Sequence, residues 1–302
     1  MHSYEQMRAS VEAGGRSRSQ RSQFGRSSST AQRGSTVEAM ATAYVQRWVA
    51  LEGAVNVRDL GGLPAGEGGR IVPGVLLRAD NLQGLTARDV AHLVDDIGVR
   101  VVVDLRTGTE VQLEGPGPLV GDDRIDIRHR SLYPEGGERT DVAADDLLPW
   151  QGRRVEGYPD ETPAVRIYLR YLHDRPDSIV AALRDVAYGA GATVVHCAAG
   201  KDRTGVLCAL ALEAVGAPRA AIVEDYVATA ERITPLMARL RASATYAADL
   251  DGRPDEAHRP RPETMSRVLE LVDEREGGVR AWLHRHGFGA LDVAALRGRL
   301  VA

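Results

Sequence analysis

One cysteine and one arginine, separated by five residues, lie where a hydrophobic stretch meets a helical pattern. The segment reads Val194-Val195-His196-Cys197-Ala198-Ala199-Gly200-Lys201-Asp202-Arg203-Thr204-Gly205, and apolar residues at helical spacing continue over 206–215. The β-branched residues before the cysteine predict a strand, which a loop and a helix N-terminus follow. Because a helix N-terminus leaves backbone N–H groups unpaired and carries partial positive charge, the spacing predicts an anion-binding loop.

The residue types in this loop suit phosphate chemistry. N–H donors around Cys197 would favour its thiolate, and the planar guanidinium of Arg203 can bind two phosphate oxygens. Attack of the sulfur on phosphorus would give a phosphocysteine, which water then hydrolyses. We expect the phosphate to be bound by Ala198, Ala199, Gly200, Lys201, Asp202 and Arg203. Since the amides and Arg203 supply the charge stabilisation, we expect neither a metal nor a cofactor.

Two flanking residues have expected supporting roles. Thr204 is placed to donate a hydrogen bond to the Cys197 sulfur and so ease its departure from phosphorus. We expect His196 to bond the loop backbone without acting as a base.

The segment His196-Cys197-x-x-Gly200-Lys201-Asp202-Arg203-Thr204-Gly205 resembles the signature loop of the cysteine-dependent protein-tyrosine phosphatase superfamily. More narrowly, it is similar to the bacterial tyrosine/serine phosphatases, whose mycobacterial members also dephosphorylate phosphoinositides. Asn56-x-Arg58-Asp59-x-Gly61-Gly62 resembles the N-terminal motif of that family. The resemblance covers roughly residues 48–302. It implies a protein-tyrosine-phosphatase-like α/β fold, with a mostly parallel sheet flanked by helices and a possible helical lid over residues 229–262.

The leaving oxygen needs a proton from a group within hydrogen-bond reach. The resemblance implies that Asp202 supplies it, because relatives with Gly-Lys-Asp-Arg use this loop aspartate. Asp104 is the second candidate, since it ends the apolar strand predicted over 99–105 and strand ends carry sites in open sheets. The wider superfamily places its acid on a mobile loop upstream of the cysteine, where this chain has Asp141, Asp145 and Asp146.

Composition sets the domain organisation and excludes several classes of protein. Residues 1–36 hold nine Ser and six Arg against two acidic residues, a charge of +4, whereas the whole chain of 302 residues carries -4. We expect 1–36 to be a disordered tail and 37–302 to be the phosphatase domain. The negative charge argues against nucleic-acid binding. No apolar run reaches the roughly 18 residues of a membrane span, and we expect no signal peptide, because residues 1–36 contain no apolar h-region.

The two cysteines make no disulfide framework, which fits a reducing, cytoplasmic setting, although secretion without a signal peptide is left open. Alternating strand and helix patterns predict an α/β sheet. A helix is expected over 37–51, and Arg58 and Asp59 are expected to pair. The region 229–262 is interpreted either as the lid or as a surface excursion.

Lys201 is the only lysine in the chain, and it lies inside the loop. Its charge favours substrates with a second phosphate or a neighbouring acid, such as phosphoinositides or phosphorylated proteins carrying phosphotyrosine or phosphoserine. A small phosphate ester, for example a nucleoside monophosphate, is the alternative substrate. A phosphate-binding pseudo-enzyme is the alternative of another class, which the intact Cys197 and Arg203 argue against.

Overall fold

A computed structural model describes residues 47–302, apart from 116, 135–157 and 251. The tail expected over 1–36, most of the helix expected over 37–51, and the upstream acids Asp141, Asp145 and Asp146 lie outside the described residues. The described end of that helix, residues 47–51, is not helical, and Trp48 instead forms a bridge with Arg58.

Five strands form one sheet in the order β1-β2-β5-β3-β4. Their bounds are β1 (Arg58–Asp59), β2 (Leu76–Ala79), β3 (Val99–Asp104), β4 (Asp126–His129) and β5 (Ala192–His196). β1 runs antiparallel to β2, whereas β5 pairs in parallel with both β2 and β3. β4 pairs in parallel with β3. The prediction of an α/β fold with a mostly parallel sheet is confirmed, and the strand that leads to Cys197 is the central one.

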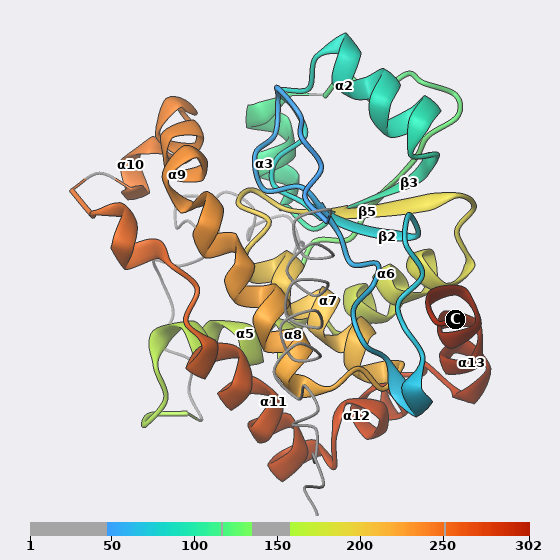
Figure 1. Cartoon of the computed structure of the whole chain (residues 1–302). Coiled ribbons are helices and arrows are strands. Elements are labelled where there is room, and N and C mark those ends of the chain that lie inside the picture. The colour runs from blue at the N-terminus through green and yellow to red at the C-terminus, as the bar shows by residue number, and fades with distance from the viewer. Residues whose placement is uncertain (1–46, 116, 135–157, 251) are drawn as a thin grey trace, which may run out of the picture. The chain divides into compact units, whose positions relative to one another are not determined.

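Helices cover both faces of the sheet, as Figure 1 shows. They are α2 (Ala87–Ala91), α3 (Gly108–Glu114), α5 (Pro163–Asp174), α6 (Pro176–Tyr188), α7 (Asp202–Ala214), α8 (Arg219–Ala228), α9 (Ile233–Ala242), α10 (Ala247–Leu250), α11 (Pro262–Glu276), α12 (Val279–Arg285) and α13 (Ala290–Leu300). A π-helical turn, His92–Asp96, continues α2, and 3-10 turns occupy Gly66–Gly68, Thr229–Arg232 and Asp255–His258.

Two apolar cores lie against opposite faces of the sheet. Successive side chains of a strand point to opposite faces, and the buried residues of β5 divide accordingly. Val195 joins the larger core with α5, α6, α7, α11, α12 and α13, whereas Val194 joins the smaller core with residues around α2. Because both faces are covered, β5 is buried along its whole length and carries the chain to the middle of the molecule.

Local sequence signals fix the starts of α2 and α3. Thr86 begins α2 and Thr107 begins α3, each in a capping box in which the threonine hydroxyl accepts from the backbone N–H three residues on. The box on α2, with Asp89, is the one the sequence predicts. The second box places the Glu110 carboxylate immediately beyond β3, at the edge where β5 delivers Cys197.

Candidate active site

The phosphate loop, residues 197–203, connects β5 to the start of α7 at Asp202. Cys197 is only 2% exposed at its base. Gly200 has a φ of +63°, and a Cβ there would lie 2.4 Å from the carbonyl oxygen of Ala79. The loop therefore needs glycine at this position both for its backbone conformation and for its close approach to β2.

The carbonyl groups of Ala198, Ala199 and Gly200 accept hydrogen bonds from residues outside the loop. The backbone N–H of Asn81 donates to Ala198 O at 3.0 Å, and the Asn56 side chain donates to Ala199 O at 2.8 Å. Arg78 donates to Gly200 O at 2.7 Å. In contrast, the backbone N–H groups of residues 198–203 donate to no acceptor among the described residues. Six amides are thus left for an anion, as the sequence predicts for a loop that opens a helix.

Arg203 is held in place by a carboxylate that the sequence analysis did not assign to the site. Its Nη1 and Nη2 lie 2.6 and 2.8 Å from the two oxygens of Glu110, and both side chains are buried. Burial would raise the pKa of Glu110, but the charge and hydrogen bonds of Arg203 outweigh it and lower that pKa. The ring of Tyr133 lies 5.5 Å from the guanidinium carbon of Arg203. The capping box at 107–110 is the sequence signal that locates Glu110.

Asp202 lies in the first turn of α7, with 36% of its side chain exposed. Tyr168 of α5 donates a hydrogen bond of 2.5 Å to its Oδ1, and Lys201 Nζ lies 3.3 Å from the same oxygen. Burial raises the pKa of Asp202, but the charge of Lys201 and the hydrogen bond from Tyr168 outweigh it. The pKa therefore lies below its ordinary value of 3.8.

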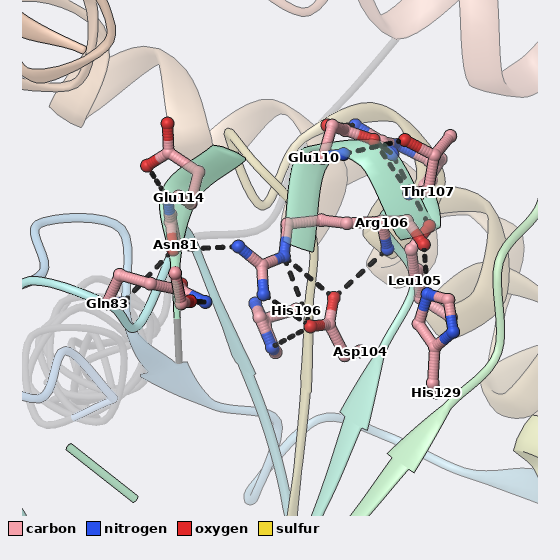
Figure 2. Close-up of polar contacts among 12 residues, drawn as sticks. Asn81, Gln83, Asp104, Leu105, Arg106, Thr107, Glu110, Glu114, His129 and His196 are labelled. Carbon is pink, nitrogen blue, oxygen red and sulfur yellow. Dashed lines mark hydrogen bonds and ion pairs between the residues drawn. The ribbon is translucent and has the colours of Figure 1, made fainter. Parts of the chain in front are cut away.

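Asp104 lies beside the loop in a buried polar cluster, shown in Figure 2. Its carboxylate accepts from the backbone and the side chain of Arg106, with contacts between 2.5 and 3.1 Å. His196 Nε2 lies 3.6 Å from Asp104 Oδ2. Burial would raise the pKa of Asp104, but the charge of His196, when protonated, and the hydrogen bonds and charge of Arg106 outweigh it and hold the pKa well below the usual range. Both carboxylate oxygens are therefore engaged with Arg106, and the side chain is only 6% exposed.

Burial lowers the pKa of His196 to about 4, so its imidazole is neutral near pH 7. Its Nδ1 has no hydrogen-bond partner among the described residues. The backbone carbonyl of His196 accepts from Leu105 N at 2.9 Å, and the imidazole lies against the Asp104 carboxylate.

Asp225 of α8 lies behind the loop at the centre of three arginines. Arg58 and Arg78 contact its carboxylate at 3.0 and 2.7 Å, and Arg47 contacts it as well. The expected pairing of Arg58 with Asp59 is wrong, because Asp59 accepts instead from the backbone of Gly61 and Gly74. The pairing fails because the buried guanidinium of Arg58 reaches across the fold to α8.

The hydroxyl of Thr204 is buried, and no residue in the described part of the chain hydrogen-bonds it. The structure thus does not show the predicted contact with the Cys197 sulfur. The remaining cysteine, Cys208, is buried in α7, and burial raises its pKa to about 11.

The region 229–262 packs directly on the phosphate loop. Ala198 and Ala199 share an apolar cluster with six residues of this region: Ile233, Leu236, Met237, Leu240, Tyr246 and Leu250. Tyr246 also donates to Glu110 Oε1 at 3.1 Å. The helical segment predicted as a possible lid therefore lies against the loop and contacts the carboxylate that holds Arg203.

Within the described ranges, no three His, Cys, Asp or Glu side chains are grouped as a metal site would require. No helix in those ranges is long and apolar enough to cross a membrane.

Comparison with known proteins agrees with this geometry. A sequence model of the tyrosine phosphatase family matches residues 49–302. A tyrosine-protein phosphatase of Nostoc commune is 30% identical over 243 residues, 78% of this chain and 78% of that protein. The triple specificity protein phosphatase PtpB of Mycobacterium tuberculosis is 30% identical over 287 residues, 83% of this chain and 98% of that protein.

Proposed function

This chain belongs to the tyrosine phosphatase family of hydrolases, and we propose that it cleaves phosphate monoesters through a covalent phosphocysteine on Cys197. The observation that supports this most is the loop itself, where six amides without an acceptor among the described residues and the guanidinium of Arg203 share one seven-residue segment with Cys197. Such fixed donors stabilise the charge that develops on a transferring phosphoryl group.

In the first step the Cys197 thiolate forms the S–P bond while the bond from phosphorus to the leaving oxygen breaks. The leaving oxygen takes a proton from Asp202. In the second step Asp202 accepts a proton from water, the water oxygen bonds to phosphorus, and the S–P bond breaks to release phosphate and the thiolate. Arg203 and the loop amides bind the phosphoryl oxygens throughout, a task that does not itself require a metal ion.

Asp202 suits the proton transfer better than Asp104 does. The side chain of Asp202 is 36% exposed at the start of α7, whereas Asp104 is almost fully buried with both oxygens bonded to Arg106. The lowered pKa of Asp202 favours its ionised form in the free enzyme. A bound phosphate dianion opposes that ionisation, because a nearby like charge raises the pKa of a carboxyl group. Substrate binding would therefore favour the protonated form of Asp202, which the first step needs.

The name of the mycobacterial relative, a triple specificity phosphatase, supports a broad range of substrates for this chain. Lys201, inside the loop and 3.3 Å from Asp202, adds positive charge that would favour phosphoinositides and phosphorylated proteins with nearby acidic groups. Phosphotyrosine and phosphoserine proteins or phosphoinositides are therefore the proposed substrates.

The test is phosphate release in EDTA from phosphotyrosine and phosphoserine peptides, phosphoinositides and nucleoside monophosphates, with Cys197→Ser as baseline. We expect release from peptides or lipids, and none from any substrate with Cys197→Ser. Turnover by Cys197→Ser would refute the covalent mechanism. A strong preference for nucleoside monophosphates would instead make the protein a small-metabolite phosphatase.

A further inference from the structure

We propose that Tyr168 is a positioning residue for Asp202. Its hydroxyl fixes the Asp202 carboxylate so that Oδ2 alone carries the transferred proton. This inference rests on the proposed role of Asp202 as the acid and base. Tyr168 is 1% exposed on α5, and its hydroxyl lies 2.5 Å from Asp202 Oδ1 and 2.9 Å from the hydroxyl of Tyr226 on α8.

The direction of these hydrogen bonds follows from counting hydrogens. Ionised Asp202 can only accept, so the single hydroxyl hydrogen of Tyr168 goes to Oδ1. The hydrogen between the two tyrosines must then come from Tyr226. The resulting chain runs from Tyr226 to Tyr168 to Asp202, and it connects α8 and α5 to the first turn of α7.

The same count places the proton of the acid form. Oδ1 accepts from Tyr168 and lies beside Lys201, whereas Oδ2 takes no hydrogen bond from any residue that the structure describes. When Asp202 is protonated, the hydrogen therefore belongs on Oδ2. In the first step that hydrogen passes to the leaving oxygen, and in the second step Oδ2 takes a hydrogen from the attacking water. Tyr168 keeps its own hydrogen in both steps.

Several charged or titratable groups act on Asp202 besides Tyr168. On the loop and α7 these are Lys201 and Arg203, which favour its ionised form. The groups that face it from other elements are Tyr133, Tyr171, Tyr226 and His258. Among the described residues, Tyr168 hydrogen-bonds the Asp202 carboxylate, whereas Tyr133, Tyr171 and Tyr226 do not. Removing its hydroxyl should therefore change the titration of Asp202 without removing a charge.

The experiment compares wild type with Tyr168→Phe by pH–rate profiles on an alkyl phosphate, which has a poor leaving group, and on an aryl phosphate. Without the donor to Oδ1, the ionised form of Asp202 is less stable and its pKa rises. The alkaline limb of the profile, where the acid is lost, should move to higher pH. The kcat on the alkyl phosphate should fall about tenfold, and that on the aryl phosphate less than about twofold.

Tyr171→Phe is the matched control. Tyr171 is equally buried and stacks on Tyr168 at 6.0 Å, but its hydroxyl bonds to Tyr133 and not to Asp202. It should leave the alkaline limb in place. Tyr226→Phe removes the donor to Tyr168 and should shift the alkaline limb of the pH–rate profile to higher pH by a smaller amount. This variant replaces Tyr168→Phe in the test if Tyr168→Phe does not fold.

Asp202→Asn separates the failure of this inference from the failure of the proposed function. If Asp202→Asn selectively loses the alkyl phosphate but Tyr168→Phe and Tyr226→Phe keep the wild-type alkaline limb, the role of Tyr168 is refuted and that of Asp202 stands. If Asp202→Asn loses both substrates equally, the acid lies elsewhere and both ideas fall. An identical shift in Tyr171→Phe would also refute the inference, because it would make the effect one of packing.

Discussion

Replacing Glu110 with Gln tests whether the phosphate loop depends on its buried ion pair. Arg203 is 4% exposed, and both of its terminal nitrogens contact the carboxylate at 2.6 and 2.8 Å. Glu110→Gln keeps the size of the side chain but turns an amide N–H₂ toward the guanidinium. Removing one charge of a buried pair costs about 3–5 kcal/mol. At roughly 2–4 °C per kcal/mol, the melting midpoint should fall by about 6–20 °C.

The pH dependence of this loss has a fixed sign. The pKa of folded Glu110 lies below its ordinary value of 4.5, because Arg203 outweighs burial. Its contribution to stability is therefore fully present above pH 4.5 and is lost as the pH falls through the lower folded value. The difference in unfolding free energy between wild type and Glu110→Gln should be constant near pH 7 and narrow below pH 4.5.

Denaturant unfolding and kcat/KM on an aryl phosphate, both measured from pH 3.5 to pH 8, provide the assay. Because Arg203 loses its fixed position, kcat/KM at pH 7 should fall by about 10²-fold. Glu114→Gln is the control, since Glu114 lies one turn later on α3 and, within the described part of the chain, accepts from the neutral groups of Asn81 and Ser243. It should cost less than about 1 kcal/mol. A loss for Glu110→Gln that is no larger than this, or is unchanged at pH 3.5, would show that the loop does not depend on the Arg203–Glu110 ion pair.

Three further changes test other parts of the site. Gly200→Ala should abolish activity and lower the free energy of unfolding in urea by at least about 2 kcal/mol, because its Cβ would lie 2.4 Å from the backbone of β2. Gly298→Ala is the control: a Cβ at Gly298 meets open space, so this change should be neutral or slightly stabilising. Asp225→Asn should cost about 3–5 kcal/mol in the same assay, since it leaves three arginines without their shared carboxylate. His196 has a folded pKa of about 4 against 6.5 ordinarily, so wild-type stability should fall by up to about 3 kcal/mol as pH drops from 6.5 to 4; a folded His196→Gln variant that keeps this slope would contradict the assignment.

The secondary structure near the site is readable from sequence because its signals are local. Apolar runs of β-branched residues predict β3 and β5, and Thr86 with Asp89 predicts the start of α2. The phosphate loop is readable for the same reason, since its cysteine, glycine and arginine lie within seven consecutive residues. The region 229–262, whose periodicity is weak and which the sequence leaves open as a lid or a surface excursion, contains α9 and α10.

The partners of these residues are not readable, because they come from distant parts of the chain. Glu110 lies 93 residues before the arginine it binds, and Tyr168 lies 34 residues before Asp202. The expected pairing of Arg58 with its neighbour Asp59 fails because its true partner, Asp225, lies 167 residues away. Local spacing can identify a reactive residue such as Arg203. The buried carboxylate that pairs with it depends on how the helices pack on the sheet.

The polar groups behind the loop explain how its amides become available to an anion. A buried carbonyl must find a donor, and Asn56, Asn81 and Arg78 supply donors on the side of the loop that faces the sheet. Once the carbonyls are bonded there, the amides have no acceptor within the described protein. An apolar replacement of Arg78 and its partner Asp225 could give an equally stable fold, yet it would release the Gly200 carbonyl and the amides that follow it. The Arg78–Asp225 pair thus holds the Gly200 carbonyl and, through it, the orientation of the loop.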